Sequence, residues 1–158
     1  MKVEEVFILG KGGRKVAKWV TAALSCADGQ PALFTVCGGG LGGERIQTDL
    51  CLLMPGGREK RDVPPISCRA LLMPAEMEIH NIDADYAVSY GMNGKDTVTV
   101  SSIDDEECVV ALQRELVTLC GAVLERQEIP IHNTQGLEKE ELLAAVGTAL
   151  LLKRHEEK

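Results

Sequence analysis

Five short apolar runs, each followed directly by glycine or proline, constrain most strongly what this chain can fold into. The runs are Val3–Leu9, Ala32–Cys37, Thr48–Met54, Ser67–Met73 and Tyr86–Tyr90. Several are apolar on both faces, which is typical of strands in a buried parallel sheet. Helical spacing over Val16–Ala27 separates the first two runs. This strand–helix–strand opening predicts an α/β fold.

The second half of the chain changes character. Thr97–Ile103 and Ala122–Ile131 alternate between apolar and polar residues, which favours half-buried strands. Glu138–Arg154 predicts a helix, because acidic residues open it and basic residues close it, as the helix dipole prefers. Residues 105–119 fit either a capped helix or a strand in a meander, and the sequence leaves both open.

Together these segments predict a single α/β domain over residues 1–158. We expect a mostly parallel, mixed sheet of the Rossmann-like or P-loop-like three-layer type, with an antiparallel C-terminal portion and a terminal helix. The domain divides at most into a parallel portion, residues 1–92, and an antiparallel portion with the helix, residues 93–158. The basic loop Gly57–Pro65 that connects the third and fourth strands is short and holds two prolines, so we expect no full crossover helix there.

Composition excludes several classes of function. The chain has 17 Lys and Arg against 24 Asp and Glu, and only 3% aromatic residues, so we expect no nucleic-acid partner. No apolar run is long enough to span a membrane, and Glu4 and Glu5 stand where a signal peptide needs basic residues. We therefore expect a cytoplasmic protein without a membrane partner. The six cysteines lack metal-binding spacing, so we expect reduced thiols and no metal.

The first candidate site is the glycine-rich turn between the first strand and the first helix. Its residues are Gly10, Lys11, Gly12, Gly13, Arg14 and Lys15. Backbone N–H groups at such a turn can bind an anion, assisted by the helix dipole and the basic side chains. Neither the dinucleotide fingerprint nor the Walker A pattern fits, because Lys15 stands where the former needs glycine and the latter a hydroxyl. The alternative is a tight turn with solvated basic residues.

Two further segments are weaker candidates. The loop Gly38–Gly43, including Gly38, Gly39 and Gly40, permits close approach of a ligand to the backbone, or is simply mobile. The acid-rich segment Pro74–Asp85 is expected to form a loop, in which Asn81 and Asp83 bind a polar ligand or are merely solvated.

The order of these elements resembles a shortened central, ATP-binding domain of the Mur ligases, which join amino acids to peptidoglycan precursors. The resemblance rests on Ala87–Gly91 with Thr97–Ile103, and on Leu124–Ile131 followed by Leu142–Ala149. It makes Gly10–Lys15 the equivalent of the phosphate loop. The family's Gly-Lys-Thr/Ser is replaced here by Gly-Arg-Lys, and Pro55 stands where a magnesium-binding glutamate is expected.

This resemblance implies a noncatalytic module that binds a nucleotide or another anionic metabolite, with a regulatory role in cell-wall metabolism. Classical ligation driven by magnesium and ATP is not expected, and the only cofactor implied is a nucleotide or phosphate. One alternative is a small enzyme that uses Arg14, Lys15, Glu76 or Asp83. Another is a homo-oligomeric assembly protein that pairs through its apolar final helix.

Overall fold

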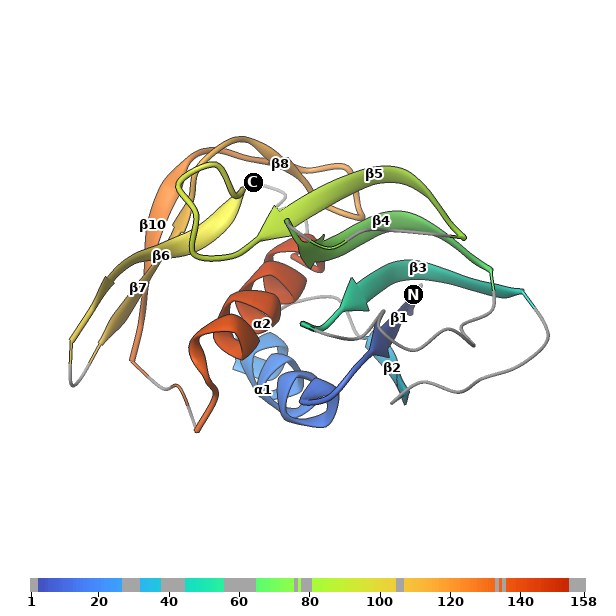
Figure 1. Ribbon diagram of the computed structural model, residues 1–158, viewed down its shortest axis with the longest axis horizontal. Coiled ribbons are helices and arrows are strands. Elements are labelled where there is room, and N and C mark those ends of the chain that lie inside the picture. Colours follow the sequence, from blue (N-terminus) through green and yellow to red (C-terminus); the bar gives the residue numbers. More distant parts are fainter. Residues whose placement is uncertain are drawn as a thin grey trace.

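The computed structural model describes residues 3–26, 32–37, 45–55, 65–75, 77, 81–104, 107–132, 134 and 136–153. These residues form two helices and ten strands (Figure 1). The helices are α1 (Gly13–Cys26) and α2 (Lys139–Leu151). The strands are β1 (Glu4–Leu9), β2 (Ala32–Cys37), β3 (Ile46–Leu53), β4 (Ile66–Pro74), β5 (Ile82–Tyr90), β6 (Val98–Ile103), β7 (Cys108–Leu112), β8 (Leu116–Val117), β9 (Val123–Leu124) and β10 (Gln127–Ile131).

Eight strands form one sheet in the order β10-β7-β6-β5-β4-β3-β1-β2, and β8 and β9 form a separate antiparallel pair. Neighbouring strands from β2 to β6 are parallel, whereas β6, β7 and β10 are antiparallel. The predicted fold class, α/β with a mostly parallel, mixed sheet and an antiparallel C-terminal portion, is confirmed. The segment that the sequence left open, residues 105–119, contributes the strands β7 and β8.

Both helices cover the same face of the sheet and pack against each other (Figure 1). Val16 and Val20 of α1 share one core with Leu143 and Ala144 of α2. A second cluster, which includes Phe7, lies on the opposite face. The described residues thus supply two of the three expected layers, namely the sheet and the helices on one side. Neither described helix is long and apolar enough to cross a membrane.

The apolar residues of α2 are used inside the chain. Leu142, Leu143, Leu151 and Leu152 are all at most 2% exposed and belong to the core that α2 shares with the sheet. Gly147 allows this close packing, because a Cβ atom there would lie 2.8 Å from Cδ2 of Leu72 in β4. Four of the leucines that suggested pairing with a second copy are therefore buried inside the protein, whereas Ala149 and Leu150 are partly buried.

The expectation of an acid-rich loop over Pro74–Asp85 is wrong for its second half, because β5 already begins at Ile82. Ile82 and Ala84 pack into the second cluster, while Asp83 and Asp85 are exposed. This alternation is the pattern of a strand with one solvated face. The acidic residues hid it, because their number suggested a loop rather than the outer face of a strand.

In β4 and β5 the regular alternation of side chains between the two faces of the sheet is interrupted. Cys68 packs opposite the helices, but Ala70, only two residues later, packs on the helix side, and the same change separates Ala84 from Tyr86. Strict alternation would keep residues two apart on one face. Arg69 lies at this irregularity, and its guanidinium is 3.4 Å from Glu4 and 3.6 Å from Asp49.

Candidate functional site

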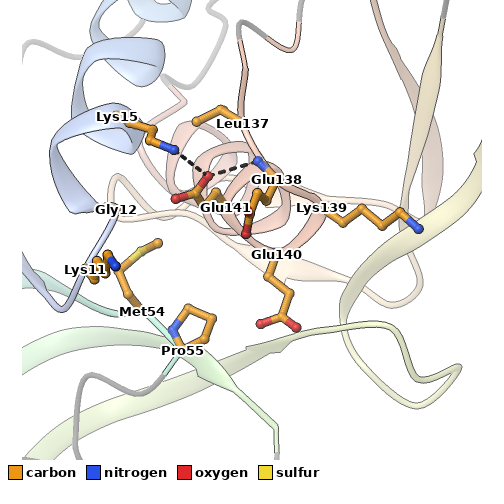
Figure 2. A pocket seen from close by; sticks show the side chains of 10 residues that line it. All are labelled: Lys11, Gly12, Lys15, Met54, Pro55, Leu137, Glu138, Lys139, Glu140 and Glu141. Carbon is orange, nitrogen blue, oxygen red and sulfur yellow. Dashed lines mark hydrogen bonds and ion pairs between the residues drawn. The ribbon is translucent and has the colours of Figure 1, made fainter. Parts of the chain in front are cut away.

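A cavity of about 800 Å³ opens at the carboxyl ends of β1 and β3 (Figure 2). It is lined by Lys11, Gly12, Lys15, Met54, Pro55, Leu137, Glu138, Lys139, Glu140 and Glu141. Within the sheet, β2 lies next to β1 on one side, and β3 lies next to β1 on the other side. The strand order therefore reverses between β1 and β3. Open α/β sheets bind their ligands in the crevice at such a reversal.

The wall of the cavity formed by the glycine turn depends on three glycines. Gly10 and Gly12 have φ values of 124° and 91°, a region that residues with a side chain rarely adopt. Gly13 begins α1, and a Cβ atom there would lie 2.7 Å from Ile8 and 2.8 Å from Val36. The first two glycines therefore allow the chain to turn out of β1, and the third lets α1 pack directly onto the sheet.

The start of α1 carries only positive charge. Arg14, Lys15 and Lys18 occupy its first turns, and its first turn holds no acidic residue. Because the amino end of a helix is itself positive, these side chains are placed unfavourably for the helix alone. An anion at the turn would stabilise both the helix end and the basic side chains.

The turn already holds an anion from the protein itself, the carboxylate of Glu141. Oε1 of Glu141 accepts a 3.3 Å hydrogen bond from Nζ of Lys15, across a sequence separation of 126 residues (Figure 2). Oε2 lies so close to Gly12 that a Cβ atom on Gly12 would collide with it. The Glu141 side chain is only 13% exposed, against 57% for Lys15. The space above Gly12, beside the amino end of α1, is therefore occupied by this carboxylate.

The same carboxylate also holds the start of α2. The backbone N–H of Glu138, the N-cap residue of α2, donates a 2.9 Å hydrogen bond to Oε1 of Glu141, at the third helical position. This is one half of a capping box, which satisfies an otherwise free donor at a helix start. The amino ends of α1 and α2 thus meet at one cavity, joined through Glu141.

The other lining side chains divide into charged and apolar groups. Lys11 and Lys15 lie on the glycine-turn side, whereas Lys139 extends away from the Lys15–Glu141 pair (Figure 2). Met54, Pro55 and Leu137 form the apolar part. The described lining residues include no serine, threonine or cysteine, so this wall offers no hydroxyl or thiol nucleophile. Across the residues that the structure describes, no three His, Cys, Asp or Glu side chains cluster as metal ligands would.

The structure separates the residues proposed from the sequence. Gly10–Lys15 form the turn at the cavity, with Lys11, Gly12 and Lys15 in its lining. Asn81 and Asp83 lie at the amino end of β5. Because β1, β3, β4 and β5 run parallel, this end is opposite to the carboxyl ends at which the cavity opens. Asn81 has a φ of 63°, and its carbonyl accepts a 2.8 Å hydrogen bond from N–H of Ile66. Gly38, Gly39, Gly40 and Glu76 lie outside the described residues.

Sequence reasoning missed the contribution of α2 to the site. The sequence pattern presents Glu138, Glu140 and Glu141 only as acids that favour the start of a helix. Comparison of the chain with models of known protein families and with curated proteins finds no match. In chemical terms the cavity offers the ammonium groups of its lysines, the carboxylates of Glu138, Glu140 and Glu141, two helix amino ends and an apolar wall. The ammonium groups and helix ends suit the anionic part of a ligand, and the apolar wall suits an apolar part.

Proposed function

We propose that this protein is a noncatalytic module that binds a nucleotide or another phosphate-bearing metabolite in the cavity between the amino ends of α1 and α2. The observation that carries the proposal is the carboxylate of Glu141, held against Gly12 and hydrogen-bonded to Lys15. Lys15, which donates to this carboxylate, and the positive amino end of α1 beside it can hold the anion of a ligand in the same way.

The proposed binding mode follows from the groups around the turn. A phosphate placed where Glu141 now lies would accept hydrogen bonds from Lys15 and meet the positive end of α1. Lys11, which lines the same wall, would contribute a second ammonium group. The apolar part of the ligand would contact Met54, Pro55 and Leu137, and a cavity of about 800 Å³ accommodates a molecule of nucleotide size.

The turn and the residues after β3 also lack the groups that phosphoryl transfer requires. A phosphate loop that transfers phosphoryl groups places a hydroxyl beside its lysine to hold magnesium, and here Arg14 and Lys15 follow Gly13. Met54 and Pro55 follow β3, where the resemblance to Mur ligases requires a glutamate. We therefore propose a shortened relative of the central Mur-ligase domain that kept the anion site and lost the reaction, with a regulatory role in cell-wall metabolism.

Calorimetric titration of the purified protein with ATP, ADP, a UDP-sugar and inorganic phosphate tests this proposal. We expect binding of at least one of these anions with and without magnesium. Lys15→Met should weaken that binding about ten- to a hundredfold, because a charge-assisted hydrogen bond is lost. Lys95→Met, which changes a lysine outside the cavity lining, is the matched control and should leave binding unchanged.

Two results would contradict the proposal. If none of the four anions binds, the cavity is not an anion site. If pure protein hydrolyses ATP with magnesium and Lys15→Met abolishes the turnover, the protein is an enzyme and the noncatalytic assignment is wrong. A coupled phosphate-release assay on both variants separates these outcomes.

A further inference from the structure

We infer that Glu141 is an internal competitor for the ligand, so that its carboxylate and the anion of the ligand occupy the glycine turn in alternation. This inference rests on the proposed function, since it needs an anion that binds at the turn. It assigns Glu141 the role of an affinity threshold: the tethered carboxylate lowers the affinity of every anion by the same factor, so only anions that bind the turn strongly displace it.

The geometry leaves no room for both anions at the turn. Oε2 of Glu141 fills the space directly above Gly12, and Oε1 accepts a hydrogen bond from Lys15. A ligand oxygen that takes either place has to displace the carboxylate, because two oxygen atoms cannot occupy the same space. The nearby carboxylates of Glu138 and Glu140 line the cavity as well, but Glu141 is the one bonded to Lys15.

Tethering makes this competitor effective. A group held on the same chain competes with an effective concentration in the millimolar range, without any further cost of association. The apparent affinity of a ligand then falls by the fraction of molecules in which the turn is free. A simple carboxylate replaces Glu141 only like for like, whereas a phosphate brings more charge and more acceptor oxygens, which stabilise it further at the amino end of α1.

Displacement also has a consequence at the start of α2. Oε1 of Glu141 accepts the N–H of Glu138, so a ligand that displaces the side chain removes half of the capping box. The first turn of α2 should therefore loosen when the ligand binds, while the glycine turn becomes more ordered. By thermodynamic reciprocity, any change that holds the start of α2 in place weakens binding of the ligand.

Two variants of equal charge separate competition from general electrostatics. Glu141→Gln removes the competing charge but keeps an acceptor, because glutamine also serves at this position of a capping box. Glu140→Gln makes the same charge change one residue away, in the same cavity lining. Suitable probes are phenyl phosphate and benzoate, which share an apolar ring and differ in the anionic group. At about pH 8 the former is a dianion and the latter a monoanion.

Affinities are measured by NMR titration of the three proteins, with unfolding in urea as the check that each variant is folded. We expect wild-type protein to prefer phenyl phosphate. Glu141→Gln should bind both probes about tenfold more tightly and by the same factor, because the neutral amide binds Lys15 more weakly and is displaced more easily in both equilibria alike. Glu140→Gln should change binding much less. On binding to the wild type, hydrogen exchange should speed up at residues 138–142 and slow down at residues 10–15.

The outcomes distinguish the inference from the function on which it rests. If wild-type protein binds phenyl phosphate but Glu141→Gln brings no gain, or no more than Glu140→Gln, the competitor role is wrong and the anion site stands. A gain that is larger for the dianion than for the monoanion would show charge repulsion instead of competition. Slower exchange at both segments would show that Glu141 stays in place. If neither probe binds any of the three proteins, the proposed function itself is wrong.

Discussion

The hydroxyl group of Tyr90 donates a 2.7 Å hydrogen bond to the backbone carbonyl of Leu53. Tyr90 ends β5 and Leu53 ends β3, so the bond passes over β4, which lies between them in the sheet. Tyr90 is 1% exposed, and burial raises the pKa of its hydroxyl. The bond therefore fixes the carboxyl end of β3 directly before Met54 and Pro55, which line the cavity.

We expect Tyr90→Phe to lower the free energy of unfolding by about 1–3 kcal/mol, because it leaves the carbonyl of Leu53 without this buried donor. Urea unfolding at neutral pH measures the change. Tyr86→Phe is the matched control, since the Tyr86 hydroxyl donates to the carbonyl of Val117 in a more exposed place. Equal losses of unfolding free energy in the two variants would show that the bond across β4 stabilises the fold no more than the more exposed bond of Tyr86.

A series of Gly→Ala variants tests the turn at the cavity. Gly94 has neither a positive φ nor any atom close to an added Cβ, so Gly94→Ala should be nearly neutral. Gly136 has a φ of 76° but open space, and its substitution should cost about 1 kcal/mol of unfolding free energy. Gly12 has a φ of 91°, and a Cβ there would push the Glu141 carboxylate away from its hydrogen bonds to Lys15 and Glu138, so Gly12→Ala should cost more, about 2 kcal/mol.

The collision and the strain at Gly12 can be told apart in a double variant. Glu141→Ala removes the carboxylate that the new Cβ would meet, and the strain of the positive φ remains. The loss caused by Gly12→Ala should therefore shrink in the Glu141→Ala background to the value found at Gly136. Thermal unfolding of the four proteins provides the cycle. An undiminished loss would place the whole effect in the backbone.

The strands were predictable from the sequence because their local pattern and their burial agree. Ala32–Cys37 matches β2 at both ends, since glycine and proline flank an apolar run. The start of β5 was missed because Asp83 and Asp85 outweighed the alternation of Ile82 and Ala84. Residues 105–119 stayed open because Cys108–Leu112 is buried only at every second position, which a short apolar run does not reveal.

The site was predictable only in part. The turn Gly10–Lys15 was predictable from local spacing, because a glycine turn and the helix after it are neighbours in the sequence. The partner of Lys15, Glu141, lies 126 residues away and is brought near by the packing of α2 on α1. No local sequence pattern predicts this contact between Lys15 and Glu141. The nearest hint was the pair Glu138 and Glu141 at capping-box spacing, which predicts a helix start but not what faces it.

The fit between α2 and the sheet can be tested at Gly147. Alanine favours a helix by about 1 kcal/mol over glycine, but its Cβ would lie 2.8 Å from Leu72. Since overpacking a core costs about 1–3 kcal/mol, Gly147→Ala should be destabilising overall. Leu72→Val makes room at this contact, so the same substitution should cost less in that background. Urea unfolding of the four proteins measures the coupling, and purely additive losses would contradict it.

The buried thiol of Cys68 should make the free energy of unfolding fall at alkaline pH. Burial raises the pKa of its thiol from 9.0 to about 11. The unfolded chain therefore releases this proton first, and the stabilisation is complete below about pH 9 and is lost as the pH rises through about 11. We expect wild-type protein to lose about 2 kcal/mol more unfolding free energy over this range than Cys68→Ala. Urea unfolding from neutral to alkaline pH, under reducing conditions, measures it; parallel profiles would contradict the assignment.

The contact between Lys15 and Glu141 also bears on how the protein matures on the ribosome. The two walls of the cavity are encoded 126 residues apart, so β1 and α1 leave the exit tunnel long before α2 is translated. A nascent chain would present a basic, unshielded glycine turn during that interval and would acquire its tethered carboxylate only when α2 docks.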